Sequence, residues 1–320
     1  MNSHPISFRA RGVLAITLIT SAWSVMTAAA HAPVSALHSE YTHQTAPTLY
    51  IDVDGARIAY RRFGHSGDEP LVFFQHFAGN LDNWDPKIID GLAAQREVIL
   101  FDNAGVAGST GEVRTTIEDT AKVGIDFLDA LGVKRADLLG LSMGSFVAQE
   151  IAVERPDLVR RLILVGSAPR GGIGMATLTP EFQAKLAKKR VVPDELLVDV
   201  FFTNSAASQA AGRAFLARVR ARSVNRDQDV SDKVAPAQAA AIVGWGAPNE
   251  HPFDYLKAIR QPVLVVGGSD DLVFYTVNSF NLAQHLANAT LIVYADSAHG
   301  SLYQYPDLFL QNATSFLNSR

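Results

Sequence analysis

The fold is decided by the stretch Asp137-Leu138-Leu139-Gly140-Leu141-Ser142-Met143-Gly144-Ser145-Phe146. An apolar run over residues 135–139 is typical of a buried strand, and apolar residues recur at helical spacing over 143–153. Between them lies Gly140-x-Ser142-x-Gly144, whose small residues allow a sharp turn without a clash of Cβ atoms. The pattern predicts that the Ser142 hydroxyl stands clear of the sheet at the positive end of a helix. It favours a nucleophilic serine over a glycine-rich turn that is merely capped by serine.

Strands and helices are predicted to alternate along the chain on both sides of this turn. Two short strands at 49–53 and 56–63 are joined by Asp54-Gly55, a hairpin signal. Further strands are expected at 70–75, 98–101, 162–165, 262–266 and 290–294, with helices at 84–94, 115–131, 279–286 and 305–317. Such alternation indicates the α/β class, with a mostly parallel central sheet flanked by helices.

The alternation is interrupted by residues 169–253, which carry helix signals and no strong strand. We interpret this segment as a helical lid inserted into a core formed by residues 48–168 and 254–320. The length and the apolar content of 48% suit one large domain with an insertion.

Residues 1–30 are predicted to be a signal peptide. Two arginines precede an uncharged apolar run at 12–26, and alanines at 28–30 offer a cleavage site. The run is short for a membrane span, so no stable span is expected after cleavage. Residues 31–47 are predicted to be a linker. The expected location is the periplasm or the medium outside the cell; a retained anchor or a mis-chosen start codon is the alternative.

Composition narrows the classes of partner. The net charge is −4 with no basic block, which argues against binding to nucleic acid. The absence of cysteine excludes disulfides and a thiol nucleophile. No His-Glu-x-x-His pattern or phosphate-binding loop is present, so neither a metal nor another cofactor is expected. The expected partner is a small acyl substrate, and the oligomeric state stays open.

A serine hydroxyl needs a base to become a nucleophile, and the base needs an acid to orient it. His299 is the candidate base, because it follows the last predicted strand and can reach the carboxyl edge of the sheet. The candidate acid is Asp271, which follows a buried strand together with Asp270. Two buried neighbouring carboxylates would repel each other, so one of them is expected to face solvent. We favour Asp271 as the partner of His299 and keep Asp270 as the alternative.

Acyl transfer also needs two N–H groups that stabilise the charge on the attacked carbonyl oxygen. The Met143 N–H, next to the candidate nucleophile, is one. The other should come from the loop after the predicted strand at 70–75. His76 lies in this loop, and we interpret it as structural rather than as a second base.

These motifs resemble the serine α/β-hydrolase superfamily, in particular its lidded esterase, lactonase and haloperoxidase-like group. The resemblance rests on the nucleophile elbow at 140–144, on Gly268-Ser269-Asp270-Asp271 and on Ala298-His299-Gly300. It implies the α/β-hydrolase fold from about residue 49 onward and assigns the second oxyanion N–H to Phe77. The chain departs from the family at Gln75-His76, where His-Gly is usual, and at Ala104, where arginine is frequent.

The resemblance implies a hydrolase that cleaves a carboxylic ester or a lactone. A catalytic triad of Ser142, His299 and Asp271 would form an acyl-enzyme intermediate, and Phe77 and Met143 would supply the oxyanion hole. Perhydrolase, haloperoxidase-like or carbon–carbon bond hydrolase chemistry on the same triad are alternatives. A non-catalytic protein that binds a small ligand is another. The substrate-binding residues stay unknown at this level.

Overall fold

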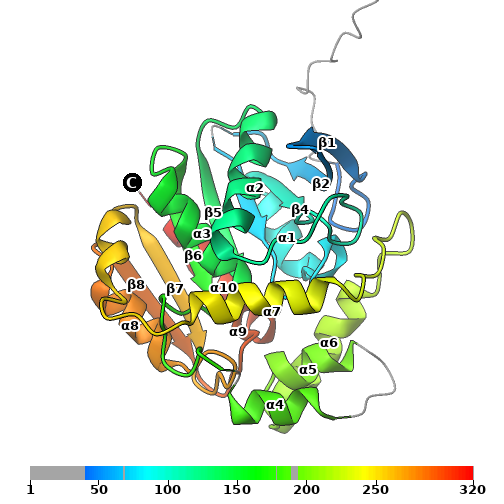
Figure 1. Cartoon of the computed structure of the whole chain (residues 1–320). Helices are drawn as coiled ribbons and strands as arrows, with labels where there is room; N and C mark the ends of the chain where they lie inside the picture. Colours follow the sequence, from blue (N-terminus) through cyan, green and yellow to red (C-terminus); the bar gives the residue numbers. More distant parts are fainter. Residues whose placement is uncertain (1–39, 68, 178, 189–193, 320) are drawn as a thin grey trace, which may run out of the picture. The chain divides into compact units, whose positions relative to one another are not determined.

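An eight-stranded sheet forms the centre of the part of the chain that the structure describes (Figure 1). This computed structural model describes residues 40–319 apart from residues 68, 178 and 189–193. The predicted signal peptide at 1–30, and the predicted linker up to residue 39, lie outside the described residues. Export therefore stays a prediction.

The strand order is β1-β2-β4-β3-β5-β6-β7-β8. The strands are β1 (Leu49–Val53), β2 (Ala56–Gly64), β3 (Leu71–Phe74), β4 (Glu97–Phe101), β5 (Ala136–Leu141), β6 (Val159–Val165), β7 (Val263–Gly268) and β8 (Ala289–Tyr294). The β1–β2 and β2–β4 pairs are antiparallel, and all other pairs are parallel. The mostly parallel sheet predicted from the sequence is confirmed.

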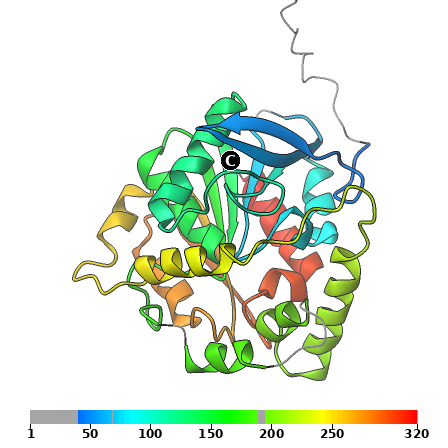
Figure 2. The ribbon, with the colours of Figure 1, turned by 45° about the vertical axis from the view of Figure 1, so that its right-hand side comes forward.

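Helices cover both faces of the sheet. They are α1 (Pro86–Ala93), α2 (Ile117–Ala130), α3 (Met143–Glu154), α8 (Val277–His285), α9 (Ser301–Gln304) and α10 (Pro306–Asn318), with a 3-10 turn η1 (Leu81–Asn83) before α1. Figure 2 shows the green helices α2 and α3 on one face and the red helix α10 on the other. Every residue of β3, β4 and β5 is buried as a result. Burial on both faces explains why these strands read as continuous apolar runs.

The boundaries differ from the sequence-based expectation by a few residues. The helix predicted at 84–94 begins at Pro86, because the Asp85 side chain accepts the Lys87 N–H and caps the helix. The strand before the turn runs on to Leu141, so the change from strand to helix takes place at Ser142 alone.

The segment between β6 and β7 is helical, as expected. It contains α4 (Pro180–Leu186), α5 (Glu195–Phe201), α6 (Ala206–Val219), α7 (Val234–Trp245) and a 3-10 turn η2 (Asp254–Ala258). Figure 1 shows these helices, in green to yellow, grouped at one end of the sheet. We call residues 169–253 the insertion from here on. No helix among the described residues is long and apolar enough to cross a bilayer.

The turn between β5 and α3 depends on two glycines that permit close packing. A Cβ on Gly140 would lie 2.4 Å from the Gly144 carbonyl oxygen, and one on Gly144 would lie 2.0 Å from the Phe74 carbonyl oxygen. Both neighbours are backbone atoms and cannot rotate away. The missing side chain at Gly144 therefore lets α3 approach β3 closely, and the missing side chain at Gly140 lets the first turn of α3 pack on the end of β5.

This packing predicts opposite effects of two glycine-to-alanine changes. Gly144→Ala should lower the free energy of unfolding by at least about 1–3 kcal/mol, because backbone must move to admit the methyl group. Gly244→Ala, in α7 with nothing within 4 Å of the added atom, should raise it by about 0.5–1 kcal/mol. Urea unfolding of both variants measures the difference. Equal stability of Gly144→Ala and the unchanged protein would contradict the packing described here.

Candidate active site

Ser142 lies at the carboxyl end of β5, at the first residue of a strained turn. Its backbone has φ 57° and ψ −125°, a conformation that non-glycine residues seldom adopt. The strain is held in place because its N–H donates to the Val165 carbonyl (2.9 Å) and its carbonyl accepts the Ser145 N–H (2.8 Å). The Ser142 side chain makes no hydrogen bond to any residue that the structure describes. The hydroxyl is thus free to react.

His299 lies in the loop between β8 and α9, and its ring is buried. Its Nδ1 is 2.8 Å from Asp271 Oδ2, while its buried Nε2 has no partner among the described residues. The ring lies against Gly166, whose added Cβ would be 2.9 Å from His299 Cε1. The carboxylate and the glycine together fix the ring orientation. With Nδ1–H donated to the carboxylate, Nε2 is the nitrogen that can accept a proton.

Asp271, and not Asp270, contacts His299. Asp271 is buried, and its Oδ1 also accepts the N–H groups of Val273 (2.9 Å) and Phe274 (3.1 Å). Burial alone would raise the pKa of Asp271, but the His299 ring and these N–H donors more than offset burial and leave the pKa lowered. Asp270 is exposed and accepts a hydrogen bond from the Ser269 hydroxyl. Asp270 faces solvent, and the role of Asp271 as the acid stays a prediction.

Phe77, in the loop after β3, lines the cavity that Ser142 also lines, and Met143 is the first residue of α3. Neither N–H has an acceptor among the described residues, as two oxyanion donors require.

Gln75, which stands where the resemblance leads us to expect histidine, supports the loop after β3. Its side chain donates to the Asn80 carbonyl (2.8 Å) and accepts the His76 N–H (2.9 Å). The left-handed residue of the loop is Ala78, with φ 52°. His76 itself does not have a positive φ, so its backbone conformation does not require the glycine that is usual in the family at this position.

His76 lies beside Ser142 and His299, and its imidazole ring is expected to be neutral at physiological pH. Its Nδ1–H donates to the Phe77 carbonyl (2.9 Å), and its ring contacts Phe201 edge-on at 5.2 Å between centroids. Burial lowers the pKa of His76 to about 4, and the hydrogen bond to Phe77 offsets this only in part. A ring that is neutral at physiological pH fits the structural role expected from the sequence, although it also lines the cavity described next.

A cavity of about 120 Å³ opens beside Ser142 and His299. Its other lining residues are His76, Phe77, Phe182, Leu186, Leu196, Leu197, Val200, Phe201, Ala239, Ile242, Val273 and Phe274. The insertion supplies most of this apolar wall, through α4, α5 and α7. Phe182, Ile242 and Phe274 were not identified from the sequence. Apolar character and helical spacing could have pointed to Phe182 and Ile242, whereas Phe274 lies in the turn between β7 and α8 and has only its apolar character.

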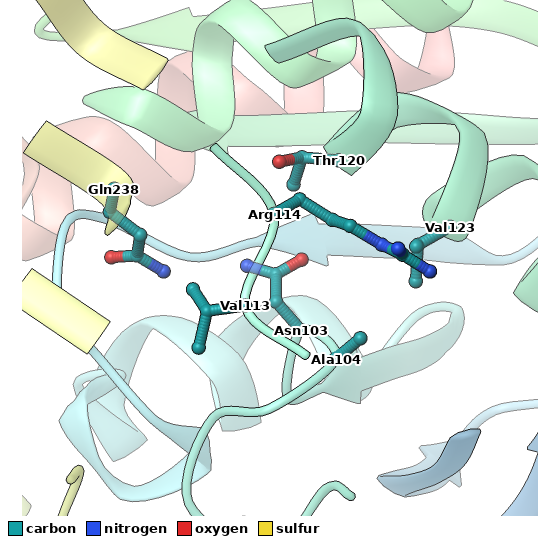
Figure 3. A pocket seen from close by; sticks show the side chains of 7 residues that line it. All are labelled: Asn103, Ala104, Val113, Arg114, Thr120, Val123 and Gln238. Carbon is teal, nitrogen blue, oxygen red and sulfur yellow. The ribbon is translucent and has the colours of Figure 1, made fainter. Parts of the chain in front are cut away.

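The loop after β4 supports the site without entering it. Asp102 accepts the N–H groups of Leu81 (2.9 Å) and Gly108 (3.3 Å). Burial and the neighbouring Asp227 carboxyl raise the pKa of Asp102 well above its usual range. Ala104, at the frequent arginine position of the family, borders a separate small pocket with Asn103 (Figure 3). The described residues contain no cluster of three or more His, Asp or Glu side chains that could hold a metal ion.

Comparison with known proteins agrees with this geometry. A family model described as alpha/beta hydrolase fold matches residues 69–306. The solved structure of an alpha/beta hydrolase fold protein from Chitinophaga pinensis is 42% identical, with a TM-score of 0.83, and the match covers 88% of this chain and 100% of that one.

Two curated relatives are more distant. The dihydrolipoyllysine-residue acetyltransferase component of the acetoin cleaving system of Cupriavidus necator is 28% identical over 79% of this chain, which spans only 64% of that relative. The 3-oxoadipate enol-lactonase 2 of Acinetobacter baylyi is 25% identical, over 78% of this chain and 89% of its own length. Each comparison extends well beyond the motif around Ser142, so the similarity is that of a whole fold.

The depressed pKa of His76 predicts a specific loss of stability in acid. The folded pKa of about 4 lies below the usual 6.5, so the neutral ring stabilises the fold fully above pH 6.5. This stabilisation is lost as the pH falls from 6.5 toward 4. At about pH 5 the free energy of unfolding should be lower by about 2 kcal/mol than above pH 6.5. His76→Phe should lose correspondingly less stability between about pH 8 and about pH 5 than the unchanged protein. Urea unfolding at the two pH values tests this, and an identical pH dependence of both proteins would contradict it.

Proposed function

Because the chain belongs to the alpha/beta hydrolase fold family, we propose that it is a hydrolase that cleaves a carboxylic ester or a lactone. Ser142 is the proposed nucleophile, His299 the base and Asp271 the orienting acid. The observation that carries the proposal is the buried 2.8 Å contact between His299 and Asp271 beside the cavity that Ser142 lines. His299 is the histidine of this cavity whose ring is oriented by a carboxylate, and its buried Nε2 has no partner among the described residues.

In the first half of the reaction, the Ser142 oxygen attacks the substrate carbonyl carbon, and the hydroxyl proton passes to His299 Nε2. Asp271 stabilises the imidazolium that forms. The carbonyl oxygen becomes negative and accepts hydrogen bonds from the Phe77 and Met143 N–H groups. The bond to the alcohol oxygen then breaks, and that oxygen takes the proton from Nε2. The product is an ester between the acyl group and Ser142.

In the second half, water attacks the acyl carbon while His299 Nε2 accepts one of its protons. The oxyanion forms again in the same place. When it collapses, the Ser142 oxygen leaves and recovers its proton from Nε2, and the carboxylic acid is released. With a lactone, the alcohol and the acid are parts of one product.

The insertion acts in this proposal as a lid that selects the substrate. Its apolar wall and the cavity of about 120 Å³ favour a small apolar acyl group or ring. Phe201 lines the cavity, whereas Phe202 is fully buried and packs on Phe215 at 5.8 Å between ring centroids. Phe201 is therefore the better candidate for setting acyl-group preference. The signal peptide predicted at residues 1–30 makes action in the periplasm or outside the cell part of the proposal.

Perhydrolase, haloperoxidase-like and carbon–carbon bond hydrolase reactions use the same three side chains and stay as alternatives within the enzyme class. A panel of esters, lactones and vinylogous diketones, assayed with the purified protein with and without hydrogen peroxide and halide, separates them. A non-catalytic ligand-binding protein is the alternative from another class. It predicts that none of these compounds is turned over although the apolar ones bind.

Ser142→Ala should abolish nearly all hydrolysis of a short-chain nitrophenyl ester and leave the fold intact. The hydroxyl takes part in the chemical step and makes no hydrogen bond within the described structure. Steady-state rates together with circular dichroism test this. Hydrolysis at an unchanged rate by a well-folded Ser142→Ala protein would refute the proposed nucleophile.

The two neighbouring aspartates provide a matched pair. Asp271→Asn should reduce kcat on the order of 10⁴-fold, because the amide holds the imidazole in the wrong tautomer. Asp270→Asn changes an exposed carboxylate and should have little effect. The same ester assay, applied to both variants, shows which aspartate orients His299. A larger loss of kcat in Asp270→Asn than in Asp271→Asn would show that the acid has been misassigned.

A further inference from the structure

Ala78, the residue after Phe77, has a backbone conformation that the surrounding structure must hold. Its φ of 52° lies in the left-handed region, which is unfavourable for alanine. Its N–H donates to Gln238 Oε1 at 2.6 Å, and only 2% of the Gln238 surface is exposed. A short buried hydrogen bond thus fixes the strained residue of the oxyanion loop.

Both ends of one peptide unit are fixed in this way. The peptide between Phe77 and Ala78 has its N–H bound to Gln238 and its carbonyl bound to the His76 Nδ1–H at 2.9 Å. A peptide held at both ends cannot rotate about its axis. Because this plane is attached directly to Phe77, holding it restricts the direction in which the Phe77 N–H points.

Gln238 reaches the loop from a distant part of the chain. It lies in the middle of α7, in the insertion, 160 positions beyond Ala78. Figure 3 shows its side chain extending from the yellow helix α7 toward Asn103 and Val113. Its neighbours on the same helix, Ala239 and Ile242, line the cavity beside Ser142. One helix therefore contacts both the substrate cavity and the oxyanion loop.

We propose that Gln238 is a positioning residue that holds the Phe77 N–H in the direction needed by the oxyanion hole. This inference rests on the proposed function, because it assigns a role to Phe77 in the same reaction. The insertion would then have two roles: it lines the substrate cavity, and through α7 it holds the oxyanion hole in place. A fixed donor needs no reorganisation during the reaction, which is what makes an oxyanion hole effective.

Three variants test the role of Gln238. Gln238→Met keeps the length of the side chain but removes the amide acceptor. Gln238→Glu keeps an oxygen in the same place and serves as the conservative rescue. Val243→Ala, a change on the exposed side of the same helix, is the matched control. Each variant is assayed on a short-chain nitrophenyl ester, and amide hydrogen exchange is measured on the peptide that contains residues 76–81.

Gln238→Met should lower kcat about 10- to 100-fold with little change in KM, somewhat less than the roughly 10²–10³ lost when an oxyanion donor is removed outright. Exchange of the loop amides should become faster in the same variant, because their local opening is easier. Gln238→Glu should retain most of kcat, and Val243→Ala should resemble the unchanged protein in both measurements.

The inference alone would be overturned by loop exchange that does not change in Gln238→Met, or by faster exchange with an unchanged kcat. An equal loss in Gln238→Met and Gln238→Glu would also overturn it, because the acceptor oxygen would then be irrelevant. If the unchanged protein hydrolyses no ester or lactone, the proposed function fails, and the role of Gln238 in it fails as well.

Discussion

The arrangement of the site depends on one constraint, the tight turn that places Ser142 between β5 and α3. The serine can hold φ 57° and ψ −125° because its own backbone groups are bonded to Val165 and Ser145. The turn also requires α3 to lie almost in contact with β3, which Gly144 allows. Parallel pairing of β3, β5, β6, β7 and β8 then brings the loops that follow these strands to one edge of the sheet. Ser142, Asp271 and His299 all lie at this edge because each follows the carboxyl end of such a strand.

The insertion contributes to this edge at several points. Phe201 contacts the rings of both His76 and His299, and its carbonyl accepts the Gly300 N–H at 3.0 Å. Gln228 accepts the Asn80 side-chain N–H at 2.9 Å, which ties a second part of the insertion to the oxyanion loop. The loops that carry Phe77 and His299 are therefore both held by residues from 169–253. In the proposed enzyme, substrate selection and the geometry of the reacting groups depend on the same helices.

Much of this arrangement could be predicted from sequence, because local patterns determine it. Buried strands, a glycine-flanked turn and the position of His299 after the last strand are all visible in short stretches. Repulsion between two adjacent buried carboxylates predicts that one of Asp270 and Asp271 faces solvent, but not which of the two. The cavity lining could not be predicted, since apolar residues on α4, α5 and α7 look alike until the helices are packed. The contact between Ala78 and Gln238 joins residues 160 positions apart, and nothing local marks either of them. The departure at Gln75-His76 could be located but not explained, because its explanation lies in the side-chain hydrogen bonds of the folded loop.

The proposed function depends on a covalent acyl intermediate on Ser142, and covalent trapping shows whether this serine is the activated nucleophile. The purified protein is treated with a fluorophosphonate, which phosphonylates activated serines and leaves unactivated hydroxyls intact. Intact mass spectrometry followed by peptide mapping then locates the added group. We expect one added group per chain, on Ser142, with loss of labelling in His299→Ala, where no base accepts the serine proton. Labelling at another residue, or continued ester hydrolysis by a fully labelled protein, would show that Ser142 is not the nucleophile.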